Sequence, residues 1–104
     1  MTGMQDRERA FEAKFAFDEE LRFKAVARRN RLIGLWAARL LGKDDAEAYA
    51  RDVVAVDFEH PGQGDLERKL RSDFDAAGVA QTDEQIRLKL VELMSEVMTQ
   101  IENG

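Results

Sequence analysis

The sequence predicts an all-α fold, a four-helix bundle with an overhanging or mobile N-terminal arm. Three observations support this prediction. The 104 residues include a single proline, and 44% are apolar and 36% charged, a balance typical of helical domains. Apolar residues recur at intervals of three and four, as on one face of an α-helix. Four such segments are separated by short stretches that contain glycine or proline.

The first predicted helix is much longer than the others. It runs from about Asp6 to Leu41, and Gly42 provides a left-handed stop. Its last part, "LIGLWAARLL", is apolar on nearly all sides and is expected to form the centre of the bundle. Gly34 costs about 1 kcal/mol relative to alanine in a helix. We therefore expect another helix to approach closely at Gly34, around Tyr49.

The other three helices are shorter and have recognisable ends. The second is expected to open with a capping box formed by Asp44 and Glu47, and the third to span Asp65 to Ala77. Thr82 and Gln85 form another capping box before the fourth helix. Short connections make neighbouring helices antiparallel. The residues expected in one buried cluster are Trp36, Leu40, Tyr49, Val53, Leu70, Phe74, Leu90, Met94 and Val97.

The length of the first helix separates an arm from the bundle. At 1.5 Å per residue it would span roughly 54 Å, whereas the other helices would span roughly 20 to 30 Å. The bundle can cover only its later half. We therefore divide the chain into an arm, residues 1–19, and a four-helix bundle, residues 20–104.

The first helix also holds most of the phenylalanine, among charges of both signs. Phe11, Phe15 and Phe17 lie in the arm, where little of the chain is available to bury them. Apolar anchors on a charged helix are typical of a segment that binds a groove on a partner. Alternatively, the arm folds back on the bundle, or the helix starts later and these side chains are partly exposed core. The sequence leaves both interpretations open.

The composition excludes most kinds of active site. Cysteine is absent and the single histidine, His60, lies in a predicted turn, so zinc and Glu-x-x-His di-iron sites are unavailable. A phosphate-binding loop and a serine triad are also absent. We expect no enzyme activity, no catalytic residue, no metal and no cofactor.

Charge and hydropathy limit the partners. The net charge of -5 argues against nucleic acid as a partner. No apolar run approaches the roughly 20 residues that span a bilayer, so the chain is not expected to be membrane-embedded. The start of the chain lacks the apolar core of a signal peptide, and we expect a cytoplasmic protein.

One basic cluster allows two interpretations. Arg28, Arg29 and Arg31 follow one another closely in the first helix. Such a cluster is commonly a solvated helix face. The other interpretation is a contact with an anion such as a nucleotide phosphate.

The first forty residues contain several short sequence motifs in a specific order. They include "DRE" from Asp6, "FEAKFA" from Phe11, "ARRNRL" from Ala27, "GLWAA" from Gly34 and "LLG" from Leu40. In these motifs the chain closely resembles the zeta-subunit family, the small inhibitors of bacterial F-type ATP synthases. The rest of the chain is similar to that family in length and in the order of its segments.

The resemblance implies a function and a partner. It implies a regulatory inhibitor whose N-terminal segment, here Met4 to about Glu19, wedges into a catalytic interface of the ATP synthase head and blocks ATP hydrolysis. The site would be at the cytoplasmic face of the ATP synthase. The residues expected to bind this partner are Arg7, Arg9, Phe11, Lys14, Phe15 and Phe17.

The resemblance also keeps an alternative function open. Weak binding of adenine nucleotide is associated with the family, which suits the phosphate interpretation of Arg28, Arg29 and Arg31. The alternative is a small adenine-nucleotide-binding helical bundle that acts as a sensor.

Overall fold

The computed structural model describes the backbone of residues 3–62 and 64–103, and the side chains of residues 19–62 and 64–102. This part of the chain contains four helices and no strand. They are α1 (Gly3–Leu41), α2 (Ala46–Glu59), α3 (Asp65–Ala77) and α4 (Asp83–Asn103). The predicted all-α fold with four helices is confirmed, including the bounds of the third helix.

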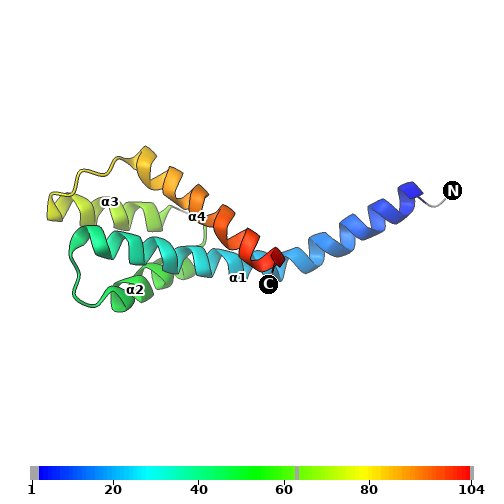
Figure 1. The fold of residues 1–104 in the computed structure, drawn as a ribbon, viewed down its shortest axis with the longest axis horizontal. Coiled ribbons are helices and arrows are strands. Elements are labelled where there is room, and N and C mark those ends of the chain that lie inside the picture. The colour runs from blue at the N-terminus through cyan, green and yellow to red at the C-terminus, as the bar shows by residue number, and fades with distance from the viewer. Residues whose placement is uncertain (1–2, 63, 104) are drawn as a thin grey trace.

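The long α1 helix gives the molecule its shape. The molecule measures 62 × 24 × 23 Å, and the 39 residues of α1 account for the long axis, at about 1.5 Å per residue. Helices α2, α3 and α4 pack along the C-terminal half of α1, and its N-terminal half extends beyond all three (Figure 1). The predicted overhang is therefore confirmed, and the arm does not fold back on the bundle.

The core lies where the four helices meet. Phe74 and Leu70 of α3 are fully buried against Ile33 of α1 and Ile86 of α4. The indole of Trp36 meets the ring of Phe74 edge-on, with centroids 5.8 Å apart and planes at 85°. Edge-to-face contacts of this kind add about 0.5–1.5 kcal/mol to the burial of the rings. This layer holds the bundle half of α1 in place.

The predicted core is largely confirmed. The predicted residues that belong to one buried cluster are Tyr49, Val53, Leu70, Phe74 and Leu90, and Trp36 packs against it. Val97 is buried and Met94 is partly buried, but neither belongs to that cluster. The prediction for Leu40 is wrong, because its side chain is 40% exposed. Leu40 lies in the last turn of α1, at the edge of the face that Ala37 occupies, and Leu41 packs against the core instead.

Gly34 marks the closest approach of α1 and α2. A Cβ atom built on Gly34 would lie 2.7 Å from the Cα and 3.1 Å from the Cβ of Ala50. Real Cβ atoms essentially never come within 3.0 Å of another heavy atom. The expected close approach is therefore present, and its partner is Ala50, the residue after Tyr49.

One of the two predicted caps is wrong and one is right. Helix α2 begins one residue later than expected, and Asp45, not Asp44, caps it by accepting a 3.0 Å hydrogen bond from the backbone N–H of Ala48. Glu47 pairs with Arg31 instead of the helix end. At α4 the capping box is confirmed: the N–H of Thr82 donates to Gln85 Oε1 at 2.8 Å, and the N–H of Gln85 donates to Thr82 Oγ1 at 3.1 Å.

Candidate functional site

The arm is a continuous extension of the helix that forms the centre of the bundle. The predicted partner-binding residues all lie on its overhanging part, and their side chains lie outside the described ones: Arg7, Arg9, Phe11, Lys14, Phe15 and Phe17. The N-terminal half of α1 extends beyond α2, α3 and α4 (Figure 1). The arm is thus joined without a helix break to the part of α1 that packs in the bundle, and we call this junction the root of the arm.

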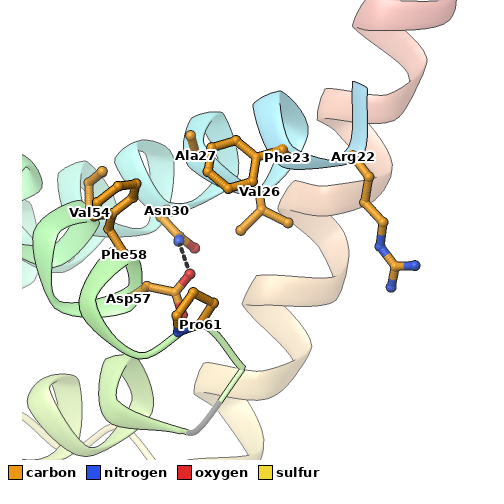
Figure 2. Close-up of a pocket in the computed structure, with 9 residues that line it drawn as sticks. All are labelled: Arg22, Phe23, Val26, Ala27, Asn30, Val54, Asp57, Phe58 and Pro61. Atoms are coloured by element: carbon orange, nitrogen blue, oxygen red, sulfur yellow. Dashed lines mark hydrogen bonds between the residues drawn. The ribbon is translucent and has the colours of Figure 1, made fainter. Parts of the chain in front are cut away.

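An apolar cavity lies at this root, between α1, α2 and the turn after α2. We call it the root pocket; its volume is about 240 Å³. Two phenylalanines line it and are largely exposed, Phe23 by 60% and Phe58 by 68%. Their rings meet edge-to-face with centroids 6.4 Å apart. The residues around the pocket are Arg22, Phe23, Val26, Ala27, Asn30, Val54, Asp57, Phe58 and Pro61 (Figure 2).

A buried polar network closes the inner end of the root pocket. The side-chain N–H of Asn30 donates a 2.8 Å hydrogen bond to Asp57 Oδ2. Arg29 donates to Asn30 Oδ1 from Nε at 3.1 Å and from Nη2 at 2.9 Å. Buried polar groups need such partners, since an unpaired one costs about 1–3 kcal/mol. In the described residues no buried side-chain nitrogen or oxygen lacks a hydrogen bond.

The charge of Arg29 in α1 is opposed by carboxylates of α2 and α3. Burial lowers the pKa of the Arg29 guanidinium, and the carboxylates of Asp57 and Glu67 oppose that shift. Arginine stays protonated at any physiological pH. The network therefore forms a structural connection between α1 and α2.

The structure divides the predicted arginine cluster. Arg28 and Arg31 line a second hollow between α1 and α2, of about 640 Å³, together with Arg51. Arg31 forms an ion pair with Glu47. Arg29 is not among the residues of this hollow, because its guanidinium is bound to Asn30. The three predicted nucleotide-binding residues thus do not face one common site.

Sequence reasoning did not find Asn30, Asp57 and Phe58. A signal existed for the first two: Asn30 lies three residues before the buried Ile33, and Asp57 lies four residues after the buried Val53. A polar residue on the apolar stripe of each of two neighbouring helices points to a buried pair. Phe58 gave no such signal, because its exposure depends on how α1 and α2 cross.

Among the described residues, no helix is both long enough and apolar enough to cross a bilayer.

Comparison with known proteins gives the family. No curated protein matches the chain. The family model described as ATPase inhibitor subunit zeta matches residues 1–100, which include the arm, the root pocket and nearly all of α4. Because this match extends over almost the whole sequence, the chain belongs to the ATPase inhibitor subunit zeta family.

Proposed function

We propose that this chain inhibits ATP hydrolysis by an F-type ATP synthase, and that it does so by inserting its arm, residues 1–19, into a catalytic interface of the ATPase head. It acts as a regulatory protein and not as an enzyme, at the cytoplasmic face of the ATP synthase. The observation that carries the proposal is the projection of α1 beyond the other helices (Figure 1). The family match supports the inhibitory role.

The dimensions of the molecule suit an arm that enters a cleft and stops. A single helix is about 10–12 Å across with its side chains. The bundle is roughly twice as wide, since the two short axes of the molecule are 24 and 23 Å. A cleft that admits the arm therefore excludes the bundle, and insertion ends at the root of the arm. The rigid connection at Asn30 and Asp57 keeps the arm aligned while it is held.

Two kinds of side chain on the arm would make the contact. Phe11 and Phe15 are four residues apart and share one face of the helix. Burying each in a groove would contribute about 1.5–3 kcal/mol. Arg7, Arg9 and Lys14 would steer the arm toward acidic residues at the rim, an effect that weakens with salt.

A nucleotide sensor is the second candidate function. In its favour, Arg28 and Arg31 line a hollow of about 640 Å³. Against it, Arg31 is paired with Glu47 and Arg29 with Asn30. The arm also has no role in that function.

The test compares inhibition of the matching purified ATPase by variants of the chain. Deletion of residues 1–19 should abolish inhibition and leave the helicity and melting of the bundle nearly intact. Phe11→Ala with Phe15→Ala should raise the half-inhibitory concentration at least tenfold, equivalent to about 1.4 kcal/mol. The matched control is Leu88→Ala with Val91→Ala, two exposed apolar side chains of α4, which should change nothing. Full inhibition by the arm-less chain would contradict the proposal and favour the nucleotide sensor.

A further inference from the structure

We propose that the surface around Phe58, at the root of the arm, is a second docking site for the ATPase head, and that its occupant is an amphipathic helix of the head with apolar side chains on one face and carboxylates beside them. This inference rests on the proposed function, because the same partner must hold the arm.

The apolar part of the surface is concentrated at one place. Phe23 and Phe58 are exposed by 60% and 68%, contact each other, and lie over the root pocket with Val26 and Val54. Figure 2 shows the side chains of Phe23, Val26, Val54 and Phe58 gathered between α1 and α2. Exposed aromatic pairs beside a cavity are typical anchors of an interface, because a side chain of the partner can fill the cavity and exclude water from both rings. Among the described residues, neither ring belongs to the core cluster.

The charged part of the surface begins on the other side of Phe58. Phe58 also lines the second hollow, where Arg28 of α1 and Arg51 of α2 are both exposed. Among the described residues, neither arginine takes part in an ion pair, whereas Arg31 is neutralised by Glu47. Glu59 is the remaining carboxylate of that hollow.

This local charge is opposite to that of the whole chain. The chain carries a net charge of -5, yet the second hollow, apart from the Arg31–Glu47 pair, holds two arginines without an ion pair among the described residues and one carboxylate. A surface with apolar anchors and an excess of positive charge is complementary to a partner with apolar and acidic residues.

The shape of the surface favours a helix as occupant. The root pocket and the second hollow lie along the seam between α1 and α2, with Ala27, Val54 and Phe58 common to both. A groove between two helices accepts apolar side chains at i, i+3 or i+4 from a third helix. Strand addition needs an exposed sheet edge, and the described residues contain no strand.

The position of the surface makes it continuous with the arm. Phe23 lies four residues after the end of the arm at Glu19, which is about 6 Å along α1. If the ATPase head binds the whole arm, its nearest further contacts on the chain are therefore Phe23 and Phe58. Two linked contacts of this kind raise overall affinity through effective concentration, without any change in either contact alone.

The experiment uses the full chain and separates the two contacts. Phe58→Ala tests the apolar anchor, and Arg28→Glu with Arg51→Glu tests the charge. The matched controls are Leu88→Ala, a side chain 63% exposed on α4, and Arg87→Glu, an exposed arginine on α4. Half-inhibitory concentration and maximal inhibition of the purified ATPase are measured at two salt concentrations, with helicity and melting followed for every variant.

The expected result is a change of affinity alone. Both surface variants should raise the half-inhibitory concentration at least tenfold and keep the maximal inhibition, while the controls stay within twofold. The charge variant should also depend less on salt than the unchanged chain. If Phe58→Ala reduces melting, the charge variant decides the question.

Three outcomes would overturn the inference. If the chain inhibits and the surface variants match their controls, the docking site is wrong and the proposed function stands. If the unchanged chain does not inhibit at all, both proposals are wrong. If sedimentation finds a dimer of the free chain that Phe58→Ala dissociates, the occupant is a second copy and not the ATPase head.

Discussion

Asn30 of α1 donates a 2.8 Å hydrogen bond to the carboxylate of Asp57 of α2, and neither residue is more than 9% exposed. The two residues lie on the apolar stripes of their helices, beside the root of the arm. A hydrogen bond has a preferred direction and length, whereas apolar contacts tolerate sliding. We interpret this pair as the contact that fixes the register of α2 on α1.

The first prediction concerns this pair. Asn30→Ala and Asp57→Ala should each lower the free energy of unfolding by about 1–3 kcal/mol, because each leaves a buried polar group without its partner. The double variant should cost less than the sum, with a coupling of about 0.5–3 kcal/mol. Urea denaturation measures all three. Asp52→Ala, an exposed carboxylate on the same helix, is the control and should stay within about 0.5 kcal/mol. Strict additivity would show that the two groups do not interact.

A second prediction concerns the crossing of α1 and α2. Gly34→Ala should gain about 1 kcal/mol in helix propensity. It should lose more than this, because the new Cβ would overlap the Cα of Ala50 and force the helices apart. Overpacking of this kind costs about 1–3 kcal/mol. We expect a net loss in thermal and chemical denaturation. A gain of stability near 1 kcal/mol would mean that the two helices separate freely at this point.

A third prediction follows from a polar contact between α2 and α3. The hydroxyl of Tyr49 donates a 2.6 Å hydrogen bond to Asp73, which also accepts one of 3.1 Å from Lys69. Desolvation raises the pKa of Asp73, but these hydrogen bonds and the charge of Lys69 outweigh it, so that the pKa of this carboxylate lies below its ordinary value. A lowered pKa in the folded state gives stability that is present above about pH 4 and lost as the pH falls through the folded value.

Tyr49→Phe removes the donor and should therefore show a cost that depends on pH. We expect a loss of about 1 kcal/mol at pH 7 that becomes smaller at an acidic pH below the lowered pKa of Asp73, where this carboxylate is protonated. Urea denaturation at the two pH values measures this. In Asp73→Asn the acid-dependent part of the stability should shrink. If Tyr49→Phe lowers the free energy of unfolding equally at both pH values, the hydroxyl stabilises the fold through packing and not through its hydrogen bond to the Asp73 carboxylate.

Much of the fold could be predicted because its signals are local. The capping box of Thr82 and Gln85 and the end of the third helix at Ala77 depend on neighbouring residues, and the structure contains both. The overhang followed from length alone. The cap of α2 was misplaced by one residue because Asp44 and Asp45 are chemically equivalent, and only the backbone path after Gly42 selects between them.

The site was harder to predict because it depends on how two helices cross. The arm was proposed as the binding segment from the sequence, because helix length separates it from the bundle and phenylalanine lies among its charges. The root pocket was not predicted, because Phe23 and Phe58 are 35 positions apart in the chain. Their rings come into contact only when α1 and α2 pack closely at Gly34 and Ala50. For the same reason Arg29 is separated from its neighbours once the helix is packed: it binds Asn30, whereas Arg28 and Arg31 line the second hollow.

Arm insertion can be tested by locating the arm on the ATPase during turnover. The chain has no cysteine, so Glu12→Cys provides a unique attachment point between Phe11 and Phe15 for a photoreactive probe. Leu88→Cys, on α4, is the control position. We expect that, in the inhibited enzyme during ATP hydrolysis, the probe at position 12 labels the subunits at a catalytic interface and the probe at position 88 does not. Labelling of catalytic subunits from position 88 alone, with none from position 12, would contradict arm insertion.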